Sequence, residues 1–313
     1  MALNIIERLV TSLLRGRINI KHISIIMDGN RRFAKDKGMH TSLGHYMGSK
    51  TLIQIIEICV RLNIKILSVF SLSLLNYNRS PEEIHFLFYL NLLILINEEF
   101  FFNFVKDHKI RIKVIGNLSY VNEHYRKIIH DIEQKTKEFD NLTLNIFFSY
   151  TSRNEMSLCK FNPNLYYDTY KNLLQERKIC YSTIALRNTI KRDIGEYVQS
   201  SAINETIHSK KIHEMKCYCG QRSFLDEEQL KIVKYHKKLL TSDLPPPNIL
   251  IRTSGEQRLS DFMLYQISEF TEIYFINEYW PVFNFLQFIY VILHYTIFQT
   301  TKLVFSYSNP CQH

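Results

Sequence analysis

Short apolar runs alternate with helical patterns along most of this chain. Residues 23–27 form an almost continuous apolar run, and similar runs occupy 64–71, 110–115 and 142–148. Such runs are typical of parallel strands that are covered by helices on both faces of a sheet. Further strands are predicted at 248–252 and 273–276, with helices at 42–61, 81–105, 120–138 and from about 260. These repeated units predict an α/β fold with a mainly parallel central sheet flanked by helices.

The first twenty residues have a different pattern. Apolar side chains recur there at helical spacing, which predicts an amphipathic helix within residues 1–20. Such a helix lies on a membrane, packs on a partner or covers the chain's own core. Glu7 and Arg8 interrupt the apolar region that a cleaved secretory signal would need. Elsewhere, no segment has the roughly 20 uninterrupted apolar residues of a membrane-spanning helix.

Composition narrows the classes of function. The 313 residues are 46% hydrophobic, enough for a large core, and the net charge of +9 suits a phosphorylated substrate or an anionic membrane surface. No nucleic-acid-binding module is recognisable, so we expect no nucleic-acid partner. The six cysteines have no framework spacing, which favours free thiols in a reducing compartment. A zinc site at His213, Cys217 and Cys219 is disfavoured because no second pair of ligands accompanies them.

A polar cluster follows the first apolar run directly. Gly29 allows the backbone to approach a ligand closely, and Asn30 is a good N-cap for the next helix. Arg31 and Arg32 on the first helical turn would attract a polyanion. Asp28 beside such an anion is best explained as a Mg²⁺ ligand, because this hard cation bridges carboxylate and phosphate oxygens.

Two more polar segments follow predicted strands. The strand that ends near residue 251 leads into Arg252, Arg258 and Ser260, which form a second candidate anion site. Ser73 and the segment 76–79 follow the strand at 64–71. Because ligands of parallel sheets bind at the carboxyl ends of the strands, two anion sites there indicate two phosphorylated substrates.

These motifs together resemble the cis-prenyltransferases, the undecaprenyl and dehydrodolichyl diphosphate synthases. The resemblance runs from residue 22 to about 298, apart from an expected insertion at about 174–228, and its details look closest to the eukaryotic dehydrodolichyl catalytic subunit. It implies one catalytic domain over 21–313 with an apolar tunnel. The matching segments are 28–35, 44–45, 76–80, 142–146, 251–262 and 279–281.

The resemblance implies a specific reaction. An allylic diphosphate, farnesyl or geranylgeranyl diphosphate, would lose pyrophosphate and be captured by the double bond of isopentenyl diphosphate. Loss of a proton would leave a cis double bond. The long-chain polyprenyl diphosphate would serve dolichol or polyprenol synthesis and protein glycosylation. The alternative is a non-catalytic partner subunit, but such subunits typically lack the first-motif aspartate, which is Asp28 here.

The resemblance also implies the roles of individual residues. Asp28 would bind Mg²⁺ at the allylic diphosphate, and Asn76 would assist proton transfer. The allylic diphosphate would contact Gly29, Asn30, Arg31, Arg32, Phe33 and His45. Isopentenyl diphosphate would contact Arg252, Arg258 and Ser260, and the rest of the predicted substrate-binding set is Ser73, Tyr77 and Arg79.

The second Mg²⁺ ligand of the family lies in a Glu-aliphatic-Tyr-Phe strand. Glu272 matches this position, and Glu269 is its rival because the preceding segment is one residue longer than in bacterial members. We favour Glu272. Other departures from the family pattern are Thr41, Leu75 and Gln257.

Two further expectations concern the tunnel and the assembly. Candidate tunnel residues are Leu87, Leu90, Leu93, Ile94, Phe100, Phe101, Phe104, Ile146, Phe147 and Phe148. The last residues lack the Arg-x-Gly ending of self-sufficient family members. The resemblance to eukaryotic catalytic subunits that share this lack implies a heteromer with a Nogo-B-receptor-like subunit, and a homodimer is the alternative. Peripheral contact with the cytoplasmic face of the endoplasmic reticulum, or a cytoplasmic location, would follow.

Overall fold

The computed structural model of the chain describes residues 3–78, 84, 87, 99–159, 213–216, 222–225, 238–268 and 270–308. Contacts between backbone positions divide the chain into two compact units. The first, which we call the sheet unit, contains Met1–Leu74, Glu82–Ser152 and Pro245–His313. The second unit contains Leu75–Pro81 and Arg153–Leu244, and the predicted insertion at 174–228 falls within it.

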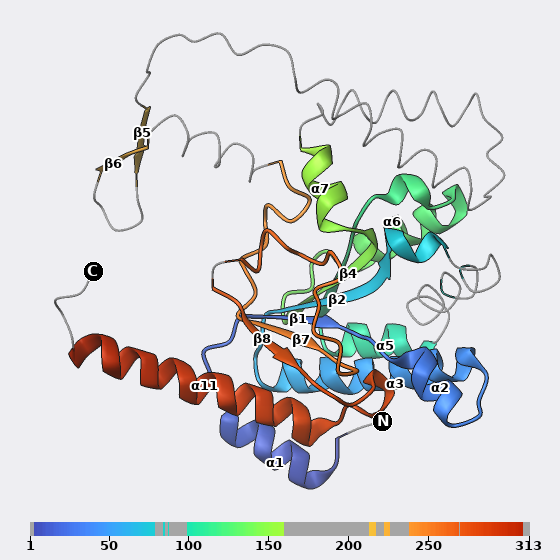
Figure 1. Cartoon of the computed structure of the whole chain (residues 1–313), viewed down its shortest axis with the longest axis horizontal. Helices are drawn as coiled ribbons and strands as arrows, with labels where there is room; N and C mark the ends of the chain where they lie inside the picture. The colour runs from blue at the N-terminus through green and yellow to red at the C-terminus, as the bar shows by residue number, and fades with distance from the viewer. Residues whose placement is uncertain are drawn as a thin grey trace. The chain divides into compact units, whose positions relative to one another are not determined.

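A six-stranded parallel sheet forms the centre of the sheet unit (Figure 1). Its strands stand in the order β3-β4-β2-β1-β7-β8. The predicted α/β class with a mainly parallel sheet is confirmed, because each apolar run became a strand. The bounds are β1 (His22–Ile26), β2 (Ile66–Ser73), β3 (Ile110–Ile115), β4 (Leu142–Tyr150), β7 (Ile249–Arg252) and β8 (Glu272–Phe275).

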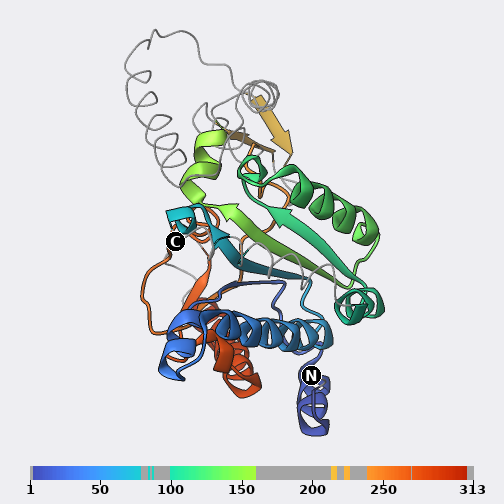
Figure 2. The same ribbon diagram turned by 90° about the vertical axis from the view of Figure 1, so that its right-hand side faces the viewer.

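Helices lie on both faces of this sheet. Figure 2 shows α3 on one side of the strands and α6 on the other, where α6 contacts β3. On the first side, α1, α2 and α11 all contact α3. The bounds are α1 (Ile5–Leu14), α2 (Asn30–Asp36), α3 (Thr41–Arg61), α5 (Glu99–Asp107), α6 (Glu123–Thr136) and α11 (Phe285–Ser308). Short 3-10 helices are η1 (Leu74–Asn78), η2 (Leu118–Tyr120) and η3 (Trp280–Val282).

The second unit contributes smaller elements. Apart from Ser152, helix α7 (Ser152–Leu158) belongs to it, and its Glu155 accepts hydrogen bonds from the amide and hydroxyl of Thr241 at 3.0 and 2.8 Å. Strands β5 (His213–Lys216) and β6 (Arg222–Leu225) form an antiparallel pair. Cys217 and Cys219 of the disfavoured zinc site lie outside the described residues.

The core of the sheet unit is aromatic where β2 and β4 meet the segment after β7. The rings of Phe70 and Phe262 stack with centroids 4.6 Å apart, and Phe147 contacts Phe262 edge-on at 5.0 Å. Of the candidate tunnel residues, Leu87, Ile146, Phe147 and Phe148 are buried. Leu90, Leu93 and Ile94 lie outside the described residues, so the tunnel stays a prediction.

The helix predicted from about residue 260 is wrong. Residues 260–268 form turns, and Ser260, Asp261 and Met263 have positive φ angles of 49°, 61° and 48°. Polar groups at the start of this segment bond to residues outside it, and a local i to i+4 bond forms later, from the Ile267 amide to the Met263 carbonyl. The Ser260 hydroxyl accepts from Arg252, and the Asp261 carbonyl accepts from the amide of Ser152 at 2.7 Å.

Candidate active site

Asp28 stands in a sharp turn between β1 and α2. Gly29 follows it with a φ of +100°, a left-handed conformation that glycine adopts without strain. The turn lets the Gly29 amide donate to Asp28 Oδ1 at 2.7 Å. The Gly29 carbonyl accepts from the amide of Phe33 at 2.9 Å, which opens α2. A buried strand thus delivers a carboxylate to the start of a helix, as the sequence predicts. The predicted cap is wrong, because Gly29 is the N-cap and Asn30 is the first helical residue, with no side chain capping the helix.

Arg252 reaches Asp28 from the neighbouring strand β7. The register pairs Ile26 with Arg252, so both strands end at the same level. Arg252 Nη2 donates to Asp28 Oδ2 at 2.8 Å, and Arg252 Nη1 donates to Ser260 Oγ at 2.7 Å and to the Arg258 carbonyl. The Arg252 side chain is only 3% exposed. Its guanidinium therefore joins the Asp28 turn to the Arg258–Ser260 segment.

These contacts determine the ionisation of Asp28. Its partial burial alone would raise the pKa of the carboxyl. The hydrogen bond and charge of Arg252 oppose burial, together with the charge of Arg32 and the Gly29 amide. The net result is a pKa below the usual value of Asp, so Asp28 is a carboxylate at neutral pH.

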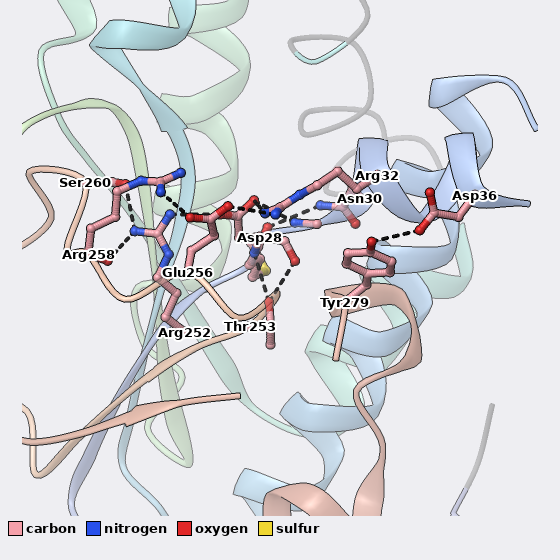
Figure 3. Close-up of polar contacts among 12 residues, drawn as sticks. Asp28, Asn30, Arg32, Asp36, Arg252, Thr253, Glu256, Arg258, Ser260 and Tyr279 are labelled. Atoms are coloured by element: carbon pink, nitrogen blue, oxygen red, sulfur yellow. Dashed lines mark hydrogen bonds and ion pairs between the residues drawn. The ribbon is translucent and has the colours of Figure 1, made fainter. Parts of the chain in front are cut away.

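Glu256 joins the two predicted anion sites. Its Oε1 pairs with Arg32 Nη1 at 2.7 Å, and its Oε2 pairs with Arg258. Arg32 also lies 3.4 Å from Asp28 Oδ1. Figure 3 shows the resulting row of alternating charges, with Asp28 and Glu256 among the arginines. Arg32 from the first cluster and Arg258 from the second are therefore neighbours through one carboxylate.

The backbone of the site is fixed by a second set of bonds. The Thr253 hydroxyl donates to the Asp28 carbonyl at 2.8 Å and accepts from the Asp28 amide at 3.0 Å. The Asp28 carbonyl also accepts from the Trp280 amide at 2.9 Å. The loop after β7 and the start of η3 thus hold the turn after β1 in place.

Tyr279 positions Arg32 from the other side. Its ring lies 5.9 Å from Arg32 Cζ, within range of a cation–π contact, and its hydroxyl donates to Asp36 Oδ2 at 2.8 Å (Figure 3). A Cβ on Gly29 would lie 2.7 Å from Tyr279 Cδ1, so only glycine fits there.

Two glycines of α3 allow α2 to pack closely. A Cβ on Gly44 would lie 2.1 Å from the Asn30 carbonyl oxygen, and one on Gly48 would lie 2.3 Å from Asn30 Oδ1. Phe33 and Gly44 are buried, and His45 is half-buried on the first turns of α3. Asn30 and His45 are therefore presented by two helices in contact.

The third predicted polar group is divided between the two units. Ser73 is buried at the end of β2 in the sheet unit, whereas Arg31 of the first cluster is exposed on α2. Asn76 and Tyr77 lie in η1, within the second unit. Arg79 lies outside the described residues. The roles of these residues stay predictions.

Glu272 stands at the far end of its strand. It pairs with Ile249 in β7, which in turn pairs with Ile23 in β1, whereas Asp28 lies two residues beyond Ile26, the last residue of β1. Three strand residues, about 10 Å, separate the level of Ile23 from that of Ile26. This register gives no support within one chain to a metal site shared by Asp28 and Glu272, and Glu269 lies outside the described residues.

A single carboxylate is sufficient for the predicted Mg²⁺. Within the described part of the chain, no three His, Cys, Asp or Glu side chains are grouped as ligands. Mg²⁺ commonly binds one or two carboxylates together with substrate phosphates and water. The ionised Asp28 carboxylate fits this role, since each of its oxygens has two lone pairs and hydrogen bonds do not fill them all.

Sequence reasoning missed Thr253, Glu256 and Tyr279. Each contacts Asp28 or Arg32 only after the chain has folded. Their positions inside the matching segments 251–262 and 279–281 were the available signal. Glu256 had the clearest signal of the three. It lies between Arg252 and Arg258 in the sequence, and a carboxylate there is expected to pair with an arginine.

Comparisons with known proteins identify the family. The family model of undecaprenyl diphosphate synthases matches residues 26–301, most of the chain. A tritrans,polycis-undecaprenyl-diphosphate synthase of Thermoplasma acidophilum is 31% identical over 280 residues, which cover 88% of this chain and 85% of the relative. The chain therefore belongs to the cis-prenyltransferase family and is a transferase of prenyl groups.

Relatives from other lineages match about equally well. A dehydrodolichyl diphosphate synthase complex subunit of Saccharomyces cerevisiae is 31% identical, covering 90% of this chain and 67% of the relative. An isoprenyl transferase of Fusobacterium nucleatum is 32% identical, covering 84% and 87%. These figures support the family and do not single out its eukaryotic branch.

Solved structures support the same fold. Lavandulyl diphosphate synthase of Lavandula x intermedia superposes with a TM-score of 0.63 at 22% identity, covering 90% of this chain and 96% of the other. A probable undecaprenyl diphosphate synthase of Campylobacter jejuni gives a TM-score of 0.54 at 23% identity, covering 88% and 95%.

Proposed function

We propose that this protein condenses isopentenyl diphosphate with an allylic diphosphate to make a long-chain polyprenyl diphosphate. The observation that carries the proposal is the charge network at the ends of β1 and β7. Through Asp28 and Glu256, it joins the arginines of two candidate diphosphate sites, Arg32 with Arg252 and Arg258. A reaction between two diphosphates needs two such sites side by side.

The network suggests how the site accepts its substrates. Arg32, Arg252 and Arg258 carry three positive charges, against two negative charges on Asp28 and Glu256. A diphosphate is a stronger partner for these guanidinium groups than a carboxylate, because it carries more negative charge and offers more acceptor oxygens. We propose that the allylic diphosphate binds to Arg32, near Gly29, Asn30 and His45. Isopentenyl diphosphate would then bind to Arg258 and Ser260, and Arg252 would lie between the two diphosphates.

Asp28 would hold Mg²⁺ beside the allylic diphosphate. The metal would supply charge neutralisation for the departing pyrophosphate. Arg32 and Arg252 would stabilise the same developing charge from fixed positions. The allylic carbon–oxygen bond breaks, the isopentenyl double bond attacks that carbon, and a proton leaves the isopentenyl unit. We propose that Asn76, with Ser73 and Arg79, assists this proton loss.

The names of two relatives bear on the choice of primer and product. The Thermoplasma acidophilum relative is named as specific for geranylgeranyl diphosphate, and the yeast relative as a dehydrodolichyl diphosphate synthase subunit. The first of these names favours geranylgeranyl diphosphate as primer, and we propose farnesyl diphosphate as the alternative. A role in dolichol or polyprenol synthesis, and through it in protein glycosylation, is part of the proposal.

Exposed apolar faces on two helices support contact of the protein with a membrane. None of the helices in the described part of the chain is long and apolar enough to cross a bilayer. Helix α1, however, leaves Ile5, Ile6, Leu9 and Leu13 exposed, while its Thr11 and the preceding Leu3 are buried. Helix α11 likewise exposes Leu286, Tyr290 and Ile297. We propose peripheral contact of α1 with the cytoplasmic face of the endoplasmic reticulum.

A partner subunit is the second part of this assembly. The yeast relative is named as the subunit of a complex, which favours a heteromer with a Nogo-B-receptor-like subunit, and a homodimer is the alternative. The exposed face of α11 offers an apolar surface for either. Sedimentation of the purified chain, alone and with a candidate partner, distinguishes the two.

The decisive experiment measures product. The chain is incubated with radiolabelled isopentenyl diphosphate, Mg²⁺, detergent and primers of different lengths, with and without a candidate partner. Wild type should form polyprenyl products, and Asp28→Ala should lower the rate at least 100-fold. Absence of any Asp28-dependent product under all of these conditions would contradict the proposed function.

A further inference from the structure

Ser254 carries two unfavourable features at one position. Its φ angle is +83°, in the left-handed region that favours glycine. The residue is 6% exposed, and within the described part of the chain its hydroxyl oxygen has no hydrogen-bond partner. A buried hydroxyl without a partner and a strained backbone each cost on the order of 1 kcal/mol or more. Together they point to a function at this residue.

The local backbone explains how the strain is maintained. The Ser254 amide donates to the Glu278 carbonyl at 2.7 Å, and the Gly255 amide donates to the Ile276 carbonyl at 2.8 Å. On the other side, Thr253 is bonded to the backbone of Asp28. The residues before and after Ser254 are therefore fixed, and its hydroxyl is held in one place.

That place is the Gly29 turn. Ser254 Oγ lies 2.9 Å from the position that a Cβ on Gly29 would occupy. The missing side chain of Gly29 thus leaves room for the Ser254 hydroxyl, directly beside the turn that holds Asp28. Hydroxyls and backbone amides in such a turn are typical partners of phosphate oxygens.

A second buried donor accompanies the hydroxyl. Arg252 Nε, two residues earlier, also lacks a hydrogen-bond partner among the described residues, although both terminal nitrogens of Arg252 are bonded. The segment 252–254 therefore contains two buried donors without a hydrogen-bond partner among the described residues. An oxyanion satisfies two donors at once, whereas a cation satisfies neither.

We propose that Ser254 is a further substrate-binding residue, whose hydroxyl donates to an oxygen of the diphosphate held at the Gly29 turn. This proposal rests on the proposed function and adds a specific contact to its allylic site. A structural role alone would not explain the features, because alanine would fill the same space without an unpaired hydroxyl and glycine would remove the strain.

The test compares Ser254→Ala and Ser254→Gly with wild type. Binding of inorganic pyrophosphate in the presence of Mg²⁺ is measured by calorimetry, and melting temperature by scanning calorimetry. Both variants should bind pyrophosphate 5- to 10-fold more weakly. Neither should melt at a lower temperature than wild type, and Ser254→Gly should melt higher because its backbone strain is relieved. In steady-state assays, the KM of the allylic primer should rise by a similar factor, while kcat and the KM of isopentenyl diphosphate change less than twofold.

Ser149 provides the matched control. It is also a buried serine with a positive φ, of 52°, but it lies in β4. Ser149→Ala should leave the Kd for pyrophosphate unchanged. The inference is overturned if both Ser254 variants bind pyrophosphate as wild type does, or if wild type binds none. Polyprenyl synthesis that depends on Asp28 but not on Ser254 would overturn this inference alone and leave the proposed function intact.

Discussion

Asp28 Oδ2 and Arg252 Nη2 lie 2.8 Å apart, although the two residues are 224 positions apart in sequence. The pair closes the ends of two adjacent parallel strands, β1 and β7. The Arg252 side chain is almost fully buried and that of Asp28 is 29% exposed. Both charges are partly removed from water, and each is stabilised by the other. The strongest effects of mutation in this site should therefore follow from breaking this pair.

Arg252→Lys should not preserve activity. The two terminal nitrogens of Arg252 hold different partners, Asp28 and Ser260, and one ammonium group does not reproduce this fork. We expect kcat/KM to fall at least 100-fold, equivalent to about 3 kcal/mol of transition-state stabilisation. Steady-state kinetics of wild type, Arg252→Lys and Arg252→Met measure this loss. Near-wild-type kinetics of the lysine variant would show that charge alone is sufficient.

Removal of Arg252 should also change the acid titration of Asp28. In wild type the pKa of Asp28 is lowered, so its ionisation stabilises the fold above the pKa of an unfolded Asp, and this stabilisation is lost as pH falls through the lower folded value. Arg252→Met should raise the pKa of Asp28, observed by carboxyl-carbon NMR. The stability difference between Arg252→Met and wild type should shrink in acid. An unchanged titration would assign the shift to Arg32 and the Gly29 amide.

Gly44→Ala should separate α2 from α3. The new methyl group would lie 2.1 Å from the Asn30 carbonyl oxygen, which is backbone and has little freedom to move. We expect the free energy of unfolding to fall by about 3 kcal/mol, against the usual gain from alanine in a helix. Urea denaturation measures the change. The control is Gly38→Ala, where no atom lies within 4 Å and only the positive φ of 63° opposes the substitution, at a cost of about 1 kcal/mol.

The strands were the most predictable part of this fold. Each central strand is recognisable from its own residues. An apolar run such as that of β1 has to be buried on both faces, whatever the order of the strands in the sheet. The segment after β7 was the least predictable. Whether residues 260–268 form a helix depends on Arg252 and Ser152, which take the polar groups of Ser260 and Asp261. No pattern within residues 260–268 predicts those contacts.

The candidate site shows the same division. Asp28, Gly29 and Arg32 were predictable because a polar turn after an apolar strand is a local feature. The position of Glu272 depends on the register of β8 against β7, which the sequence does not encode locally. The bridging role of Glu256 likewise depends on two arginines from different segments.

His22 should make the fold less stable in mild acid. It is fully buried in β1, where Nδ1 lies 2.7 Å from the Pro245 carbonyl and Nε2 lies 2.7 Å from Ser68 Oγ. Burial lowers its pKa to about 4, although the Pro245 carbonyl acts in the opposite direction. The unfolded chain therefore binds more protons than the fold between pH 4 and 6.5, and the free energy of unfolding should rise with pH across this window. The slope from this group is at most about 1.4 kcal/mol per pH unit.

The variant His22→Gln isolates this contribution. It lacks the titrating group, so its free energy of unfolding should vary less with pH in the same window, whatever its stability at neutral pH. Urea denaturation at several pH values compares the two proteins. Equal slopes for variant and wild type would mean that other groups cause the pH dependence.

Helix α1 should bind anionic membranes through its exposed apolar side chains. The exposed fractions of Ile5, Ile6, Leu9 and Leu13 are 77%, 71%, 59% and 63%. Exposure of such an apolar cluster to water is unfavourable. The helix itself is held to the protein because the Leu3 amide donates to Glu57 of α3 at 3.3 Å. In flotation with phosphatidylserine-containing vesicles, Leu9→Glu should weaken binding at least tenfold, since it removes about 2 kcal/mol of apolar burial and adds a charge. Gln134→Glu adds the same charge at an exposed position of α6 and should float as wild type does. Equal loss in both variants would attribute binding to net charge instead of to the apolar face of α1.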